Sequence, residues 1–159
     1  MKKTSQKETI LVVDDIEDNV NLIGGLLEEE GFNVIRTTDG AEALDIIARN
    51  KIDLVLADIV MQDIDGRKIC KTIKANPRTR HIPVILLSAN RTNVTDIAQG
   101  LEMGADEFIP KPVDRQELLA RVPSMARIKS VCDELELKKI QLEKANMLLQ
   151  ELPSILVKG

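Results

Sequence analysis

The sequence predicts an α/β fold in which five parallel strands form a sheet covered by helices on both faces. Five short apolar runs alternate along residues 1–122 with segments whose apolar residues recur every three or four positions. This change from strand-like runs to helical spacing is typical of repeated strand–helix units. The runs are almost continuously apolar, as expected for parallel strands that are buried on both sides.

Each expected strand is a run rich in Val, Ile and Leu. The five runs lie at residues 10–13, 32–36, 52–57, 83–87 and 105–109. They have the length of strands and are too short to cross a lipid bilayer. For five such units we expect a doubly wound, flavodoxin-like sheet with strand order 2-1-3-4-5 and one helix after each strand.

Turn and capping residues delimit the five helices. Gly31 and Gly104 are expected to end the first and fourth helices, and the third must end before Pro77. Asp39 and Asp114 are each followed three residues later by Glu, which predicts capping boxes at the starts of the second and fifth helices. The five apolar faces are Val20, Ile23, Leu26 and Leu27; Ala41, Leu44, Ile47 and Ala48; Ile69, Cys70 and Ile73; Val94, Ile97, Ala98 and Leu101; and Leu118, Leu119 and Val122.

A separate, longer helix is predicted after Pro123, which we expect to break the fifth helix. Residues 124–152 contain no Gly or Pro. Positions 128, 135, 142 and 149 are seven apart, positions 131, 138, 145 and 152 follow them by three, and seven of these eight residues are apolar. The pattern favours a coiled coil, and an amphipathic helix folded back on the same domain is the alternative. Pro153 should end this helix.

The predicted organisation is a disordered N-terminus at 1–8, a domain at 9–122, the long helix at 124–152 and a tail at 153–159.

The net charge of −4 argues against a strongly basic nucleic-acid surface. With Phe32 and Phe108 as the only aromatic residues, base-stacking platforms are disfavoured. A single histidine and two distant cysteines do not support a zinc site or a disulfide framework. The polar N-terminus predicts a cytoplasmic protein without membrane association.

Reactive side chains follow four of the five expected strands. Asp14 and Asp15 follow the first strand, Asp58 the third, Ser88 the fourth and Lys111 the fifth. Because the carboxyl ends of parallel strands meet at one edge, these side chains should lie together. Clustered carboxylates favour a hard cation such as Mg²⁺. Beside it, Asp58 could act as a nucleophile on phosphorus and form an acyl phosphate, with Lys111 and Ser88 holding phosphoryl oxygens.

These segments resemble the receiver domain of two-component response regulators. The matching pieces are Val-Val-Asp-Asp at 12–15, Asp-Leu-Val-Leu-Ala-Asp at 53–58, Leu-Leu-Ser-Ala at 86–89 and Met-Gly-Ala-Asp-Glu-Phe-Ile-Pro-Lys-Pro at 103–112. The resemblance covers residues 8–122. It implies that Asp58 is a phosphoacceptor, charged from a phosphohistidine on a sensor histidine kinase or a phosphotransfer protein. It also implies that Asp15 binds Mg²⁺ directly, Asp14 through water and Val60 through its backbone carbonyl.

The resemblance further implies a two-state switch. Ser88 would move to meet the phosphoryl group, Lys111 would pair with it, and Phe108 would turn inward. The peptide bond before Pro112 is expected to be cis. Val60 and Asn90 occupy positions that tune dephosphorylation in the family.

One loop departs from the family pattern. Met-Gln-Asp at residues 61–63 replaces the common Met-Pro. We expect a looser, solvated loop at Asp63, next to the phosphoacceptor.

Several functional interpretations follow from this resemblance. The first is a non-enzymatic switch that acts through the fourth helix, fifth strand and fifth helix, and through a homodimer formed by that face or by the C-terminal helix. The alternative is a regulatory receiver fragment of a larger enzyme, such as a diguanylate cyclase or a hybrid histidine kinase.

Direct DNA binding is disfavoured because residues 124–159 fit one helix with six basic and five acidic side chains. A haloacid-dehalogenase-type phosphatase is disfavoured because Val60 stands where those enzymes place a second acid.

Overall fold

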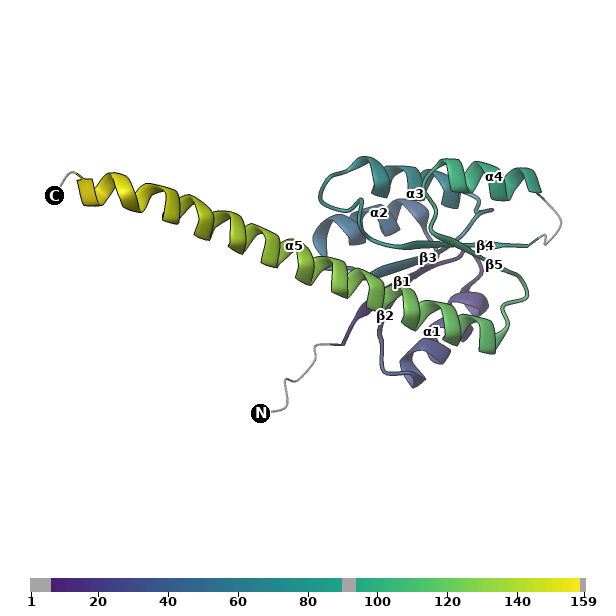
Figure 1. The fold of residues 1–159 in the computed structure, drawn as a ribbon. Coiled ribbons are helices and arrows are strands. Elements are labelled where there is room, and N and C mark those ends of the chain that lie inside the picture. Colours follow the sequence, from purple (N-terminus) through teal and green to yellow (C-terminus); the bar gives the residue numbers. More distant parts are fainter. Residues whose placement is uncertain (1–6, 90–93, 158–159) are drawn as a thin grey trace.

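The chain folds around a five-stranded parallel sheet (Figure 1). The structure is a computed structural model that describes residues 7–89 and 94–157; for residues 96, 97, 99, 100 and 153–157 it describes the backbone alone. The strands are β1 (Thr9–Val13), β2 (Asn33–Thr37), β3 (Leu54–Asp58), β4 (Val84–Ser88) and β5 (Glu107–Pro110). Their order is β2-β1-β3-β4-β5, which confirms the predicted topology. Each strand begins within two residues of its expected start.

Helices cover both faces of the sheet. They are α1 (Glu17–Glu29), α2 (Gly40–Arg49), α3 (Gly66–Ala75), α4 (Val94–Glu102) and α5 (Arg115–Val157). Figure 1 shows α2, α3 and α4 on one side of the sheet, with α1 and the first part of α5 on the other. The two sides correspond to two separate groups of buried apolar residues.

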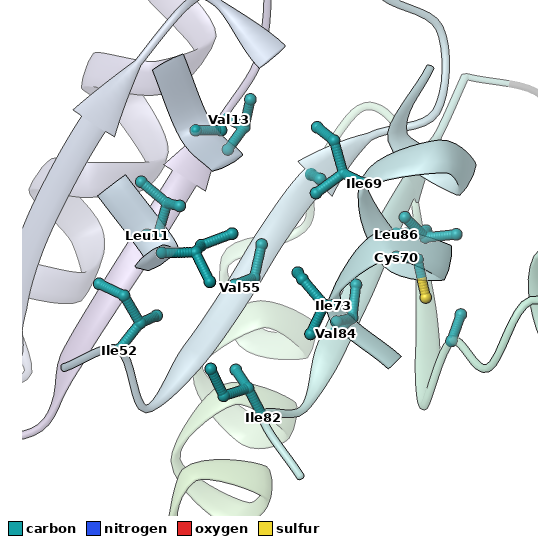
Figure 2. Packing of buried hydrophobic residues seen from close by; sticks show 14 of the residues in the cluster. Leu11, Val13, Ile52, Val55, Ile69, Cys70, Ile73, Ile82, Val84 and Leu86 are labelled. Carbon is teal, nitrogen blue, oxygen red and sulfur yellow. The ribbon is translucent and has the colours of Figure 1, made fainter. Parts of the chain in front are cut away.

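Alternate residues of each strand supply these two cores. In β1, Leu11 and Val13 pack towards α2 and α3, whereas Ile10 and Val12 pack towards α1 and α5. Figure 2 shows the first core, where strand residues such as Val55 meet Ile69 and Ile73 of α3. Burial of one such side chain contributes about 1.5–3 kcal/mol, so this two-sided packing makes the sheet a rigid base for the residues at its ends.

The fifth helix and the C-terminal helix are one continuous helix, and the prediction of two separate helices was wrong. α5 runs for 43 residues through both Pro123 and Pro153. The described residues therefore contain four shorter helices and this long one. A proline inside a helix costs about 3 kcal/mol because it removes one backbone hydrogen bond and crowds the preceding turn. At Pro123 this cost is opposed by Val122 and Ala126, which are buried against the sheet on either side of it.

The second half of α5 does not fold back on the domain. All residues from Glu134 to Leu152 are exposed, and Figure 1 shows this part of the helix projecting away from the sheet. Within the described chain, no helix has the length and apolar character needed to cross a membrane.

A buried lysine anchors α5 where it leaves the domain. The Lys129 side chain is 4% exposed and pairs with Asp133 one turn later. Its Nζ lies 3.6 Å from Oδ1 of Asp53, the residue just before β3. The other carboxylate oxygen of Asp53 accepts a 2.8 Å hydrogen bond from the Thr9 amide. This cluster ties α5 to the edge of the sheet opposite the carboxyl ends of the strands.

We expect Lys129→Met to lower the free energy of unfolding by about 1–3 kcal/mol, because two carboxylates lose their buried cation. Thermal denaturation measures the change. Adding Asp53→Asn to this variant should cost less than Asp53→Asn costs alone, because the two residues share one interaction. If the two substitutions lowered the free energy of unfolding by strictly additive amounts, the proposed interaction between Lys129 and Asp53 would be contradicted.

Candidate functional site

Three charged side chains from distant parts of the sequence meet at the carboxyl ends of β1, β3 and β5. Asp14 directly follows β1, Asp58 is the last residue of β3, and Lys111 directly follows β5. The Lys111 Nζ lies 2.7 Å from Asp14 Oδ2 and 2.6 Å from Asp58 Oδ2. Asp14 and Asp58 are buried, and the Lys111 side chain is mostly covered. One ammonium group therefore bridges two buried carboxylates.

Asp15 completes an acidic pocket with these two carboxylates. One carboxylate oxygen from each of Asp14, Asp15 and Asp58 lies within 4.8 Å of the others. Asp14 is held in place by the Ile16 amide at 3.0 Å and by Asn19 Nδ2 at 3.3 Å. Three carboxylates facing a single ammonium leave the pocket negatively charged. All-oxygen donors of this kind fit Mg²⁺, which prefers a few carboxylates together with water or phosphate oxygens.

Burial and pairing act against each other in this pocket. Burial raises the pKa of Asp58, and it outweighs the hydrogen bond and charge of Lys111, which act to lower that pKa. Burial also acts to lower the pKa of Lys111, but its hydrogen bonds to Asp14 and Asp58 outweigh this, and the net pKa is raised. The raised pKa keeps Lys111 in its ammonium form. A further positive charge in the pocket would lower the pKa of Asp58 and stabilise its carboxylate form.

The loop after β3 contacts Asp58 through Val60. The Val60 amide donates a 3.2 Å hydrogen bond to Asp58 Oδ1, and the Val60 side chain is exposed. The Val60 backbone therefore lies next to the acidic pocket.

The other predicted site residues lie on β4 and β5. Ser88 is the last residue of β4 and is buried, and its backbone carbonyl accepts a 2.6 Å hydrogen bond from the Lys111 amide. Phe108 in β5 is half-buried and packs against the core beneath α2 and α3. The Lys111–Pro112 peptide bond is cis. Asn90 lies outside the described residues.

Sequence reasoning missed the structural role of Asp63. Its Oδ2 accepts hydrogen bonds from the Gly40 amide at 2.8 Å and from the Ala41 amide at 3.2 Å, at the start of α2. Gly40 allows this close approach, since a side chain there would place its Cβ 2.9 Å from Ile64 Cβ. Asp63 is exposed, as expected, but it ties the loop after β3 to the start of α2, whereas a looser loop was expected. The sequence around Asp63 carried no local signal of this contact, because it joins residues more than twenty positions apart.

We expect Asp63→Ala to speed hydrogen exchange at the Gly40 amide and to cost about 1 kcal/mol, the usual value of an N-terminal cap. Backbone amides, first that of Ile64 and then that of Ala41, hold the pKa of Asp63 below its ordinary value. This contribution should be present above the ordinary pKa of aspartate and lost as the pH falls through the lowered one. Gln62→Ala, at the exposed neighbour, is the control. Equal rates of hydrogen exchange at the Gly40 amide in the two variants would contradict the contact between Asp63 and the start of α2.

Comparisons with known proteins agree with this fold. A family model described as the response regulator receiver domain matches residues 10–123. Response regulator PleD of Caulobacter vibrioides is 47% identical over 126 residues, which are 79% of this chain and 28% of PleD. Transcriptional regulatory protein CpxR of Escherichia coli is 44% identical over 118 residues, which are 74% of this chain and 49% of CpxR.

Solved structures give the same result. A putative response regulator from Chloroflexus aurantiacus is 31% identical with a TM-score of 0.73, covering 77% of this chain and 99% of that one. The receiver domain of a signal transduction histidine kinase from Syntrophus aciditrophicus is 32% identical with a TM-score of 0.70, covering 76% of this chain and 90% of that one.

A parallel 2-1-3-4-5 sheet with an acidic pocket and a lysine at its carboxyl edge defines a receiver-type signalling domain. The chain belongs to the response regulator receiver domain family, whose model spans most of its length. It spans 28% of PleD and 49% of CpxR, so it covers half or less of these curated relatives.

Proposed function

We propose that the chain is a phosphoacceptor switch in which Asp58 takes a phosphoryl group from a phosphohistidine of a sensor histidine kinase or phosphotransfer protein. The observation that carries the proposal is the contact of Lys111 Nζ with both Asp58 and Asp14. A buried carboxylate nucleophile thus lies next to a fixed cation and two further acids. Membership of the receiver family supports the same role.

In the proposed reaction, a carboxylate oxygen of Asp58 forms a bond to phosphorus while the phosphorus–nitrogen bond to the donor imidazole breaks. The electron pair of that bond returns to the imidazole, and Asp58 becomes an acyl phosphate. The Lys111 ammonium, which contacts Asp58 before transfer, pairs with a phosphoryl oxygen afterwards. The Ser88 hydroxyl moves to donate to another.

Asp14, Asp15 and Asp58, with the Val60 carbonyl, would hold Mg²⁺. Asp15 would bind it directly and Asp14 largely through water. Bound there, the ion supplies positive charge that offsets the charge of the phosphoryl oxygens. The three carboxylates provide the matching negative charge before any phosphoryl group arrives.

A hollow beside the pocket supports access by a protein donor. Its volume is about 380 Å³, and it is lined by residues that include Asn19, Leu22, Lys111 and Pro112. Leu22 is exposed on α1. An apolar surface of this kind next to Lys111 suits the side of a helix that presents a phosphohistidine.

The proposal is tested by incubating the chain with acetyl phosphate and weighing the intact protein. With Mg²⁺ we expect the addition of one phosphoryl group, and with EDTA a large loss of incorporation. Equal incorporation under both conditions would remove the role of the acidic pocket. No incorporation under either condition would contradict the phosphoacceptor itself.

The signal would leave through the surface of α4, β5 and α5. Phosphorylation would draw Ser88 towards the phosphoryl group and let Phe108 turn inward, which shifts this surface between two states. α5 begins on that surface and continues without a break into the exposed helix. A homodimer held together through this face or through α5 would then carry the signal to the output, and the chain itself would act as a switch with no turnover of an external substrate.

A second candidate function is regulation within a larger enzyme, such as a diguanylate cyclase or a hybrid histidine kinase. The observation that favours it is the partial coverage of relatives, with 28% of PleD matched. The similar receiver domain from Syntrophus aciditrophicus is part of a signal transduction histidine kinase. Sequencing the source gene beyond the codon for Gly159 distinguishes the two, since a following catalytic domain would favour the second.

A further inference from the structure

The distal part of α5 exposes an unusual amount of apolar surface. Between residues 134 and 152 every residue is exposed. An isolated helix in water is marginally stable. The stability of the distal part of α5 therefore depends on what packs against its apolar side. The large apolar side chains that are at least 41% exposed on α5 are Ile128, Val131, Leu135, Leu137, Ile140, Leu142, Met147, Leu148, Leu149 and Leu152.

The receiver domain does not pack against this apolar side, because it contacts the opposite side of α5. Val122, Ala126 and Lys129 are buried against the domain, and Asp133 pairs with Lys129 on the same stripe. Each residue turns an α-helix by about 100°, which places Val131 and Leu135 roughly opposite Lys129. The side that carries the heptad residues therefore faces solvent from Ile128 onwards.

The spacing of these apolar residues matches a second helix of the same kind. Ile128, Leu135, Leu142 and Leu149 form one column of positions seven apart, the a column. Val131, Lys138, Ala145 and Leu152 form the d column. A repeat of 3.5 residues maintained over four heptads keeps the same side turned towards a supercoiled partner.

Charges beside the columns select the orientation of that partner. In a parallel, in-register pair, the residue before each a position faces the residue five places later on the other helix. Glu134 then faces Lys139 of the second copy, and symmetry gives this pair twice. The next such pair joins the uncharged Gln141 and Asn146. The charges at the flanks are thus complementary between identical chains.

We infer that α5 forms a parallel, two-stranded coiled coil with a second copy of this chain, with residues 128–152 as its seam and Glu134 paired with Lys139 across it. The inference rests on the proposed function in that it specifies the dimer assigned there to α5. The seam is exposed without phosphorylation, so the dimer forms in the unphosphorylated chain. Lys138 meets its own copy in the d column and is the weak layer of the seam.

The test is sedimentation equilibrium of the full chain without a phosphodonor. The wild type should dimerise. Leu142→Asp, in the a column, should raise the dimer dissociation constant by about 100-fold or more, because a charge replaces a buried leucine. Leu137→Asp changes a similarly exposed leucine outside both columns and should leave the constant unchanged. Lys138→Leu should tighten the dimer.

Charge reversal tests the orientation. Glu134→Lys and Lys139→Glu should each weaken the dimer by about three- to tenfold, because each creates two like-charge pairs. The double variant restores opposite charges and should regain wild-type affinity. A monomeric wild type, equal effects of Leu142→Asp and Leu137→Asp, or a double variant weaker than both single variants would each overturn the inference.

The same samples separate this inference from the phosphoacceptor proposal. Residue 142 lies far along α5 from the acidic pocket, so Leu142→Asp should still accept a phosphoryl group from acetyl phosphate. Phosphorylation without dimerisation of the wild type would reject the coiled coil alone. A wild type that dimerises but takes up no phosphoryl group from acetyl phosphate and Mg²⁺ would reject the phosphoacceptor alone.

Discussion

Asp58→Asn should abolish phosphoryl incorporation from acetyl phosphate in the presence of Mg²⁺. The amide of asparagine has nearly the shape of the carboxylate and can still accept a hydrogen bond from Lys111. It lacks the charged oxygen that attacks phosphorus, so the fold remains while the proposed chemistry stops. Intact-protein mass spectrometry measures the loss, and the expected residual incorporation is none.

A matched control separates this effect from the general loss of a carboxylate. Asp45 is exposed on α2, away from the acidic pocket. Asp45→Asn should incorporate as much phosphoryl group as the wild type. Full incorporation by Asp58→Asn would place the acceptor on another residue and reject the proposed role of Asp58.

Gly66→Ala should destabilise the fold strongly, although it adds only one methyl group. A Cβ at Gly66 would lie 2.1 Å from the backbone oxygen of Asp58 and 3.2 Å from Ile59 Cα. The Gly66 amide also donates a 3.0 Å hydrogen bond to the Ile59 carbonyl. The start of α3 therefore rests directly on the end of β3, and backbone rather than a flexible side chain would have to move. We expect a loss of about 3 kcal/mol in the free energy of unfolding.

Gly25→Ala provides the opposite expectation within the same protein. Gly25 lies inside α1, and a Cβ there meets nothing within 4 Å. Alanine favours the helix by about 0.5–1 kcal/mol over glycine, so this variant should be more stable than the wild type. Urea denaturation of both variants measures the difference. A Gly66→Ala variant as stable as Gly25→Ala would contradict the close packing of α3 on β3.

Local rules predicted the parts of the fold that depend on neighbouring residues. Gly31 and Gly104 were expected to end helices, and both have positive φ values, 95° and 98°. Asp39 caps α2 by accepting hydrogen bonds from the Ala41 and Glu42 amides. In the expected capping box Glu42 would accept from the Asp39 amide, but the Thr37 hydroxyl accepts from that amide instead and donates to Glu42. The identity of the cap was predictable, and the intervening hydroxyl was not.

Long-range packing decided the features that local rules missed. Pro123 predicts a break by itself, but burial of Val122 and Ala126 keeps α5 continuous. Lys129 entered the sequence analysis only as one of the six basic side chains of residues 124–159, and its pairing with Asp53, 76 positions earlier, could not be predicted from its neighbours. The hydrogen bond that Asp63 accepts from the Gly40 amide likewise joins residues that are distant in sequence. In contrast, Asp14, Asp58 and Lys111 could be brought together from sequence because parallel strands place their carboxyl ends at one edge.

The most direct test of the central claim is to locate the phosphoryl group after reaction with acetyl phosphate and Mg²⁺. Borohydride reduces an aspartyl phosphate to homoserine, which marks the acceptor permanently, and peptide mass spectrometry then identifies it. We expect homoserine at position 58 and unchanged aspartate at positions 14 and 15. A mark at either of those positions, or at none of the three, would contradict Asp58 as the phosphoacceptor.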